Sequence, residues 1–363
     1  MSTRLVAGCM TGTSLDALDV ALVEIHGAGL EARAAPRGFH SAPLGELGAP
    51  LRALADASPC SAGEIAHLAQ AFALLHVKAL RALLGSTRPD LIAVHGQTVF
   101  HDPPASWQLL CPTPIALALR APVVFDLRAA DLALGGQGAP ITPLADLLLF
   151  HHPNERRAIV NLGGYCNVTW LPACATPNAA ALAAVRGGDV CACNQLLDAL
   201  ARRLLGRPFD GEGSAAAGGH IHAAAFDDLL ARLGQQASAG RSLGAGDELS
   251  DWISGWRGQA PPADILRTAC EAVGRTIGER VRDVERVALA GGSVQNGVLR
   301  AAIARSAGAP VGRTDDLGVP MLQREAIGMA VLGALCQDRV PITLPQVTHV
   351  PPPAPVAGCW VSP

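Results

Sequence analysis

Two apolar runs near the start of the chain, residues 5–7 and 20–23, flank a loop rich in glycine and small polar residues. This arrangement predicts a β-hairpin with a tight loop. The same arrangement returns in the second half, where residues 157–160 and 168–171 flank Asn161-Leu162-Gly163-Gly164. The repeat predicts an α/β chain of two similar lobes that each open with a hairpin, although so common a motif can also recur by chance.

The first loop, Gly8 to Asp19, has the composition of a phosphate-binding loop. Gly12 lets the backbone bend toward a ligand, and successive backbone N–H groups can form an anion-binding concavity. Asp16 and Asp19 would repel a bare phosphate, so they fit beside one only if Mg²⁺ and its waters lie between. The spacing alone leaves two interpretations open, a nucleotide loop and an ordinary polar hairpin.

Composition narrows the classes of partner. The 363 residues suffice for about two domains, and a formal net charge of -3 without a basic patch argues against nucleic acid as a partner. The ten cysteines are too sparse for a disulfide scaffold, so we expect reduced thiols and a cytoplasmic protein. No apolar stretch is long enough for a signal peptide or a membrane span, and we therefore expect no membrane partner.

The single lysine, Lys78, excludes two kinds of phosphate site. A P-loop and a protein-kinase strand each require a lysine, but Lys78 lies in the run 64–84, where apolar residues recur at helical spacing. Ser61 and Glu64 form the pattern of a capping box before that helix. Phosphate chemistry must therefore rest on backbone N–H groups, hydroxyls, arginine and metal.

Polar residues follow two expected strands of the first half. His95-Gly96-Gln97-Thr98 comes after the run 91–94, and Asp126 and Arg128 come after the run 123–125. Ligands of α/β proteins tend to bind at the carboxyl ends of strands, so these residues are site candidates, although His95 could equally be a satisfied loop histidine. The glycine-rich turn at 135–140 is interpreted as the crossing between the two lobes.

Asp189 precedes an expected helix over residues 195–205. Asn194 is the expected N-cap, and Gly206 the expected stop. A carboxylate in a loop ahead of a helix can accept a proton from water or a sugar hydroxyl while nearby N–H groups hold it ionised. Asp189 is thus a candidate general base.

A further glycine turn, Gly291-Gly292, follows the expected strand at 287–290. Such a turn admits a flat adenine or ribose against the backbone. Helices are expected at 298–305 and at 324–336, and the second of them could cover this turn.

Other motifs resemble a zinc site and a hydrolase site, but each lacks a feature that such a site needs. Cys191 and Cys193 form a lone Cys-x-Cys pair without a further ligand at zinc spacing, and the His220-Ile221-His222 segment has the same defect. The run Gly240-Arg241-Ser242-Leu243-Gly244 matches the nucleophile elbow of hydrolases, but no buried strand precedes it.

In their order, these motifs resemble the anhydro-N-acetylmuramic acid kinase family, which belongs to the sugar kinase, Hsp70 and actin superfamily. The resemblance extends from Gly8 to about Thr348. It rests on a collinear series of segments: Gly8 to Asp19, His95 to Thr98, Asp126 with Arg128 and Asp131, Gly135 to Pro140, Asn161 to Gly164, Asn167 to Thr169, Gly291 to Asn296, Thr314 to Gly318, and Glu325-Ala326.

The resemblance implies a two-lobed actin-like ATPase fold, a duplicated ribonuclease H-like fold with a nucleotide cleft between the domains. It implies an enzyme that uses ATP and Mg²⁺ to open the 1,6-anhydro ring of the amino sugar anhydro-N-acetylmuramic acid and to phosphorylate O6. The product would be N-acetylmuramic acid 6-phosphate, in the recycling of cell-wall murein. A homodimer is compatible with this class.

The resemblance also implies residue roles. Asp189 stands at the position of the family's catalytic aspartate, and Mg²⁺ would be carried by ATP near Asp16 and Asp19. The expected nucleotide contacts are Gly12, Thr13, Ser14, Leu15, Asp16, Ala17, Leu18, Asp19, Gly163, Gly164, Gly291 and Gly292. The expected sugar contacts are His95, Gln97, Asp126, Arg128 and Glu325.

The chain departs from the family pattern after Asp189, where Val190-Cys191-Ala192-Cys193 replaces Thr-Gly-Pro-Gly. If the family's glycines adopt positive φ, the two cysteines would be strained, or the loop would take another path and move Asp189. Ala17 replaces a usual glycine, and residues 237–242 lack the usual lysine and glutamate. Two alternatives stay open: a relative that binds nucleotide or murein sugar without turnover, and a kinase for a related anhydro-sugar.

The domain expectation is a first lobe over residues 1–126 and a second over 127–345, with the last helix either in the second lobe or returned to the first. Residues 346–363 contain four prolines between 351 and 355. Such a segment is expected to be a loosely held arm.

Overall fold

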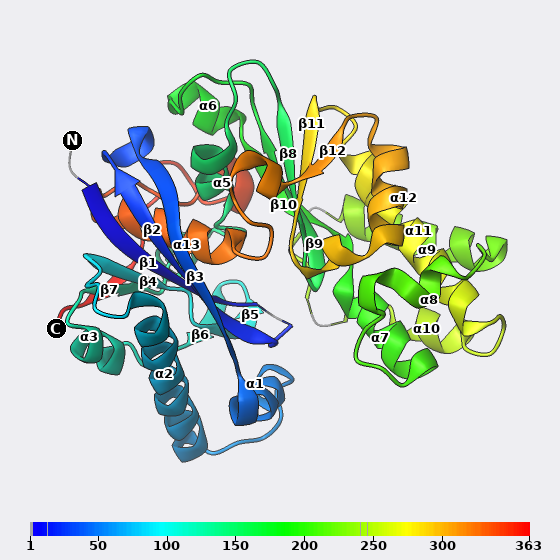
Figure 1. The fold of residues 1–363 in the computed structure, drawn as a ribbon, viewed down its shortest axis with the longest axis horizontal. Helices are drawn as coiled ribbons and strands as arrows, with labels where there is room; N and C mark the ends of the chain where they lie inside the picture. Colours follow the sequence, from blue (N-terminus) through cyan, green and yellow to red (C-terminus); the bar gives the residue numbers. More distant parts are fainter. Residues whose placement is uncertain (1–2, 13, 240, 245) are drawn as a thin grey trace. The chain divides into compact units, whose positions relative to one another are not determined.

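The computed structural model describes residues 3–12, 14–239, 241–244 and 246–363, and it divides the chain into two compact units (Figure 1). Unit 1 comprises the residues up to His151 together with Ala175–Val185 and Gln323–Pro363. Unit 2 comprises His152–Cys174 and Arg186–Leu322. Each unit is built around its own sheet.

Unit 1 contains a six-stranded sheet in the order β13-β7-β4-β1-β2-β3. Strands β1, β2 and β3 form an antiparallel meander, whereas β4 pairs parallel to β1 and β7 pairs parallel to β4. The strands are β1 (Thr3–Thr11), β2 (Ala17–His26), β3 (Arg33–Pro43), β4 (Leu91–Val94), β7 (Val123–Phe125) and β13 (Cys359–Val361), and a separate hairpin consists of β5 (Gln97–Asp102) and β6 (Ala105–Leu109).

Unit 2 contains a five-stranded sheet in the order β10-β9-β8-β11-β12. Its first three strands are again antiparallel neighbours, and its last two are again parallel. The strands are β8 (Arg157–Leu162), β9 (Tyr165–Leu171), β10 (Arg186–Ala192), β11 (Arg286–Ala290) and β12 (Val311–Arg313). Both sheets therefore share one topology, with β13 as an addition in unit 1, and the predicted duplicated α/β fold is confirmed.

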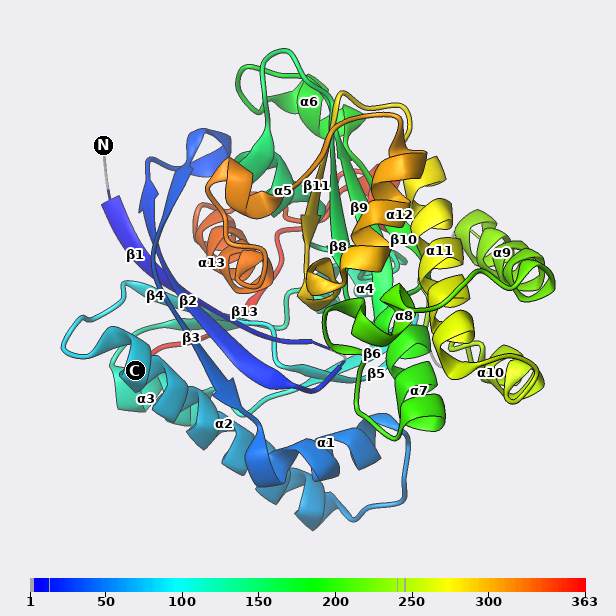
Figure 2. The ribbon, with the colours of Figure 1, turned by 45° about the vertical axis from the view of Figure 1, so that its right-hand side comes forward.

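The helices of unit 1 cover both faces of its sheet, with α2 and α3 on one side and α13 on the other (Figure 2). The predicted capping box at the start of α2 is present: the Glu64 N–H donates to Ser61 Oγ over 3.2 Å, and the Ser61 N–H donates to Glu64 Oε2 over 2.6 Å. The helices are α1 (Gly48–Ala55), α2 (Ala62–Leu84), α3 (Thr113–Leu119), α4 (Ala129–Ala133), α5 (Pro143–Phe150), α6 (Ala179–Ala184), α13 (Arg324–Gln337) and α14 (Pro345–Thr348).

Gly8 on β1 allows α13 to approach the sheet closely. A Cβ at Gly8 would lie 2.0 Å from the Ala326 carbonyl oxygen and 2.5 Å from the Ala330 nitrogen, so a side chain at residue 8 would collide with the helix backbone. The last long helix thus packs against the first strands of unit 1, which is one of the two positions that the sequence leaves open.

In unit 2, α11 and α12 lie side by side against the sheet (Figures 1 and 2). Gly274 and Gly278 of α11 permit this approach, because a Cβ on either would lie within 2.6 Å of an α12 side chain. The helices of unit 2 are α7 (Asn194–Leu205), α8 (Ser214–Ala217), α9 (Ala223–Ser238), α10 (Ser250–Trp256), α11 (Pro262–Arg280) and α12 (Gly297–Ala307).

The unit boundary differs from the lobe boundary expected at residue 126, because residues 127–151 and 323–345 belong to unit 1. The glycine turn at 135–140 is likewise internal to unit 1 rather than a crossing. The Gly138 N–H donates to Asp131 Oδ2 over 2.8 Å, and the Gln137 N–H donates to the Thr348 carbonyl over 2.7 Å. Glycine content alone could not distinguish a turn pinned by a buried carboxylate from a linker.

The C-terminal segment is not a loosely held arm, contrary to the expectation from its prolines. Thr348 and Val350 are buried, and β13 pairs antiparallel with β7 through Cys359–Val361. The Thr348 hydroxyl donates to Asp131 Oδ1 over 2.7 Å. The prolines hide any sequence pattern of a strand, but this segment contributes β13, the edge strand of the six-stranded sheet. Within the described ranges, no helix has both the length and the apolar character needed to cross a bilayer.

Candidate active site

The loop between β1 and β2 forms a tight turn. The Leu15 N–H donates to the Gly12 carbonyl over 3.1 Å, and Leu15 adopts the left-handed conformation with a φ of 57°. Gly12 has no positive φ, so the unusual conformation expected of a glycine belongs to Leu15. Thr13 lies outside the described residues.

Two predicted contacts in this loop can offer only backbone groups to a ligand. The side chains of Leu15 and Leu18 are buried in the core of unit 1, and Ala17, Leu18 and Asp19 already belong to β2. Arg52 of α1, which the sequence did not single out, donates from Nη2 to the Ser14 carbonyl and supports the loop from outside.

A buried hydroxyl at the end of β1 fits a phosphate ligand. Thr11 is 3% exposed, and its Oγ1 has no hydrogen-bond partner among the described residues. A buried hydroxyl without a partner is costly, and a phosphate oxygen or a bound water would satisfy it.

Three carboxyl groups interact near the start of β2. Burial raises the pKa of Asp19 to about 6, the hydrogen bond from Ser41 opposes this shift, and the charges of Glu325 and Asp16 add to it. Glu325 stands in the first turn of α13, so the close packing of α13 against β1 and β2 brings it to this loop. In the described part of the chain, no group of three or more His, Cys, Asp or Glu side chains has the arrangement of a metal site.

His95, at the carboxyl end of β4, is a neutral hydrogen-bond acceptor for Arg128. Arg128 donates from Nε and Nη2 to His95 Nε2 over 3.2 and 2.9 Å, while His95 Nδ1 lies 2.9 Å from the Gly96 carbonyl. Burial, followed by the charge of Arg128, lowers the pKa of His95 to about 3. Arg128 also donates to the Gly138 carbonyl over 2.9 Å, so the turn at 135–140 fixes the orientation of the guanidinium group.

Two buried polar atoms on the β5–β6 hairpin have no hydrogen-bond partner among the described residues, Gln97 Oε1 and His101 Nε2. Gln97 Nε2 donates to the Thr98 carbonyl, and His101 Nδ1 lies 2.9 Å from Ser106 Oγ, so both side chains are held from one end. Burial, then the charge of Arg128, lowers the pKa of His101. His101 is not among the site residues predicted from the sequence. The available signal was that Gln97, Val99 and His101 alternate along one strand and so share a face with a predicted site residue.

Asp126 directly follows β7 and adopts a positive φ of 52°. This conformation costs a non-glycine residue free energy, and such strain clusters at functional sites. The backbone conformation of Asp126 therefore supports its prediction as a site residue.

In unit 2, the turn Gly163-Gly164 holds the start of α7. The N–H groups of Cys193 and Gln195 donate to the Gly164 carbonyl, and that of Asn194 donates to the Gly163 carbonyl, each over 3.0 Å. The first amides of α7 thus donate to the glycine turn, whereas the Asp189 carboxylate accepts from the Leu243 N–H. The N-cap is Cys193 rather than Asn194.

The turn after β11 requires glycine. Gly291 has a φ of 92°, and a Cβ there would lie 2.7 Å from the Leu162 carbonyl oxygen. At Gly292, in contrast, no atom would lie within 4 Å of an added Cβ, so the space beside it is open. The Ser293 hydroxyl donates to Asn194 Oδ1, so the two glycine turns and the start of α7 form one assembly.

Asp189 lies within β10, opposite Asn167, and not in a loop ahead of α7. A register shift between Asp189 and Cys191 places Val190 in a bulge of the β10–β9 ladder. Bulges redirect side chains, and this one ends the regular pairing at Asp189. The Asp189 carboxylate accepts a hydrogen bond of 2.8 Å from the Leu243 N–H.

The two cysteines after Asp189 do not adopt the left-handed backbone conformation. Cys191 and Cys193 are absent from the residues of positive φ, and both side chains are buried in the core of unit 2. Of the two alternatives drawn from the lost glycines, the strain of a positive φ is not found, and β10 continues as an extended strand to Ala192.

The segment that contacts Asp189 is held by its own network. Arg241 pairs with Asp247 over 2.7 and 2.8 Å, and the Tyr165 hydroxyl donates to the Gly244 carbonyl over 2.5 Å. Gln236 Nε2 donates to the Asp247 carbonyl, and Gln236 Oε1 accepts from the Ala192 N–H of β10. This segment contains the run 240–244 that matches the nucleophile elbow of hydrolases, of which Gly240 lies outside the described residues. It contacts Asp189 through the backbone N–H of Leu243.

Comparison with known proteins identifies the family. The family model described as "Anhydro-N-acetylmuramic acid kinase" matches residues 4–355. Proteins named anhydro-N-acetylmuramic acid kinase are similar to this chain in Bordetella petrii, at 36% identity over 95% of this chain and 93% of the relative, and in Salinibacter ruber, at 34% identity over 96% and 94%. The relative of that name in Synechococcus elongatus is 34% identical over 96% of this chain and 97% of its own.

Among solved structures, component A of the (R)-2-hydroxyglutaryl-CoA dehydratase of Acidaminococcus fermentans has a TM-score of 0.47 at 14% identity and covers 91% of this chain and 98% of its own. That likeness is too distant to support an argument. The family model and the relatives, however, match nearly the whole chain. The chain belongs to the anhydro-N-acetylmuramic acid kinase family.

Proposed function

We propose that this protein is an ATP-dependent kinase that hydrolytically opens the 1,6-anhydro ring of anhydro-N-acetylmuramic acid and phosphorylates O6, within the recycling of murein. The observation that carries this proposal is the family match across residues 4–355. The product is N-acetylmuramic acid 6-phosphate.

The proposed reaction needs one general base. Water attacks the anomeric carbon, the bond from that carbon to O6 breaks, and O6 takes the γ-phosphoryl group that ATP supplies. We assign the base to Asp189, whose carboxylate accepts the proton of the attacking water. Its position is supported by the bulge at Val190 and by the 2.8 Å hydrogen bond from the Leu243 N–H.

We assign the phosphate side to the two glycine turns and the β1–β2 loop. The Thr11 hydroxyl without a partner and the open space at Gly292 support a ligand at these places. Gly12, Ser14, Asp16, Gly163, Gly164 and Gly291 are proposed as backbone or polar contacts. Asp16 and Asp19 are proposed to approach Mg²⁺ that arrives with ATP, since a hard cation takes carboxylate oxygens.

We assign the sugar to unit 1 residues at the ends of β4 and β7. Gln97 Oε1 can accept from a hydroxyl or amide of the sugar, and His101 Nε2 supplies a second unsatisfied atom on the same hairpin. His95 acts as a positioning residue, because it holds the guanidinium group of Arg128. Asp126 and Glu325 complete the proposed sugar contacts. The ten cysteines are all free thiols, which supports a reducing compartment such as the cytoplasm.

The decisive experiment is a coupled ADP-release assay with Mg·ATP and anhydro-N-acetylmuramic acid, with the product mass determined. The natural protein should release ADP and add the mass of one water and one phosphoryl group (HPO3) to the sugar. Asp189→Asn, which keeps an acceptor for the Leu243 N–H, should bind ATP normally and lose about a thousandfold in kcat. That figure is on the order of what removal of a general base costs.

Each other outcome has a distinct meaning. Saturable sugar or nucleotide binding without ADP release would replace the kinase by a binding protein. ADP release only with another anhydro-sugar would change the substrate. Full activity in Asp189→Asn would leave the reaction intact but remove Asp189 as its base.

A further inference from the structure

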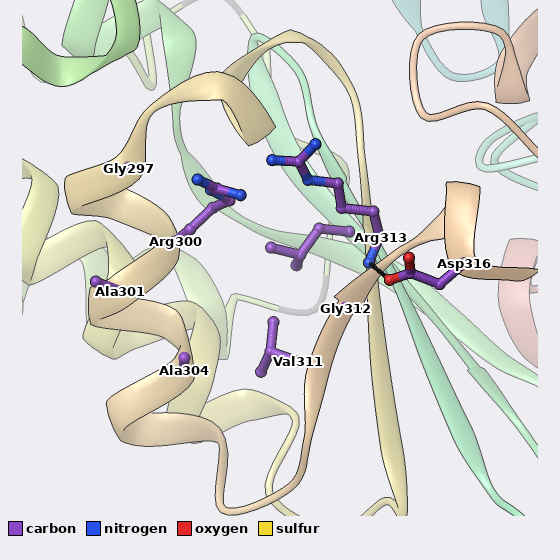
Figure 3. Close-up of a pocket in the computed structure, with 9 residues that line it drawn as sticks. Gly297, Arg300, Ala301, Ala304, Val311, Gly312, Arg313 and Asp316 are labelled. Carbon is purple, nitrogen blue, oxygen red and sulfur yellow. Dashed lines mark hydrogen bonds between the residues drawn. The ribbon is translucent and has the colours of Figure 1, made fainter.

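A groove in unit 2 lies between helix α12 and the edge strand β12, and its lining includes none of the residues assigned above (Figure 3). It has a volume of about 490 Å³ and is widely open to solvent. The groove exists because α12 turns small residues toward it: Gly297, Ala301 and Ala304 lie on one face at helical spacing. Its floor is apolar and consists of Leu289 and Val311.

Two arginines reach into this groove from opposite elements, Arg300 from α12 and Arg313 from the end of β12. Figure 3 shows their guanidinium groups directed toward the same opening. Arg300 Nε is buried and has no hydrogen-bond partner among the described residues. An unsatisfied buried donor on a cation is expensive, so the geometry favours an acceptor in the groove.

Asp316 is the one acidic residue among the described residues that line the groove, and its carboxylate is engaged by its own turn. Asp316 Oδ2 accepts from the Arg313 backbone N–H over 2.8 Å, within the 3-10 turn η5 (Thr314–Leu317). In contrast, Arg305 on the same helix pairs with Glu271, and Arg286 on the adjacent strand donates to Glu155 over 3.1 Å. Of these four arginines, Arg305 and Arg286 have a carboxylate partner, whereas no ion pair of Arg300 or Arg313 is found among the described residues.

We propose that this groove is a binding site for a small phosphate monoester, separate from the sugar and nucleotide contacts of the proposed kinase reaction. Two guanidinium forks match the oxygens of a dianionic phosphate, and charge-assisted bonds of this kind are the strong ones. The apolar floor receives the organic part of the ligand. The groove volume falls within the range of small-molecule sites.

The test is calorimetric titration with phenyl phosphate and with inorganic phosphate, on the full chain with the non-hydrolysable ATP analogue AMPPNP at saturation. The analogue keeps the nucleotide phosphate contacts occupied, so that a remaining site is measured alone. Phenyl phosphate should bind more tightly than inorganic phosphate, because only the ester uses the apolar floor.

Four variants identify the site. Arg300→Ala and Arg313→Ala should each weaken phenyl phosphate binding by about ten- to a hundredfold, as expected for lost charge-assisted bonds. Arg202→Ala removes an exposed arginine from α7 and should leave the affinity unchanged, which controls for net charge. Ala304→Leu, which fills the groove without changing its charge, should abolish the preference for the ester.

Absence of phenyl phosphate binding in the folded natural protein would overturn the proposal. Binding that survives both Arg300→Ala and Arg313→Ala would also overturn it, because the ligand would then lie elsewhere. Failure of the kinase assay would leave this inference standing, since the titration requires no turnover.

Discussion

The carboxyl group of Asp19 couples the β1–β2 loop to pH. Its folded-state pKa of about 6 lies above the ordinary value of 3.8, chiefly because of burial. Between these two values the folded chain binds more protons than the unfolded chain, so the protonated group favours folding. This contribution is fully present below about pH 4 and is lost as the pH rises through 6.

We therefore predict that Asp19→Asn gains stability relative to the natural protein as the pH rises from 5 to 7. The asparagine cannot ionise, and it escapes the cost of a buried charge. Chemical denaturation at several pH values, without nucleotide or magnesium, measures the difference. Asp283→Asn, an exposed carboxylate of unit 2, is the control and should show no such trend. A difference that is flat with pH would contradict the assignment.

The thiols next to Asp189 are predicted to be inert in the folded protein. Burial raises the pKa of Cys193 to about 12 and the pKa of Cys191 well above its ordinary value, so almost no thiolate exists at pH 8. Ellman's reagent at pH 8 should modify the exposed Cys60 and Cys359 first and leave Cys191 and Cys193 untouched. Peptide mass spectrometry reads the sites, and urea-unfolded protein, in which all ten should react, is the control.

At the scale of elements, the C-terminal strand replaces what the sequence presents as a tail. Strand β13 covers the outer edge of β7, which would otherwise expose unpaired backbone groups. It also follows α14, whose Thr348 shares Asp131 with the glycine turn at 135–140. The Gly138 carbonyl of this turn accepts a hydrogen bond from Arg128. The C-terminal segment therefore supports Arg128 of the proposed sugar site indirectly, through Asp131 and the turn.

Deletion of residues 351–363 should therefore destabilise unit 1. The lost pairing of three residues and the exposed β7 edge are worth roughly 2–3 kcal/mol at about 1 kcal/mol per hydrogen bond. The first thermal transition should fall by about 5 °C. Deletion of only Ser362 and Pro363, which leaves β13 intact, should change it little. An unchanged transition in the longer deletion would show that the segment is dispensable.

At the scale of the whole molecule, unit 1 is closed by residues that are remote in sequence. Arg324 at the start of α13 donates from Nε to Asp146 Oδ1 of α5 over 2.8 Å, and each side chain of this ion pair is 2% exposed. The two residues are 178 positions apart. The pair thus connects the N-terminal part of unit 1 with the segment that returns from unit 2.

We predict that Arg324→Met lowers the free energy of unfolding by about 3–5 kcal/mol, because the Asp146 carboxylate remains buried without its guanidinium partner. The double variant Asp146→Leu/Arg324→Met should recover most of this loss, since no buried charge is left. Urea denaturation of both variants and of the natural protein measures the coupling. Equal losses in the single and double variants would show that the packing of the two side chains, rather than their charge, is what counts.

The local sequence was sufficient to predict the α2 capping box, the paired hairpins and the two-sheet α/β class. Each of these depends on residues a few positions apart, so period and cap chemistry specify them directly. The family and its proposed reaction were also within reach of the sequence, because the order of the glycine and acidic segments is itself a linear property.

The tertiary structure alone decided the rest. It placed Asp189 in a bulged strand, where the carboxylate accepts from the N–H of Leu243, 54 residues away, and it showed that Cys191 and Cys193 adopt no positive φ. It returned residues 323–363 to unit 1, and it left Gln97 Oε1, His101 Nε2 and Arg300 Nε without hydrogen-bond partners in the part of the chain that the structure describes. These facts depend on which groups distant in sequence come into contact and on which polar atoms lack a hydrogen-bond partner after packing. No local pattern in the chain encodes either.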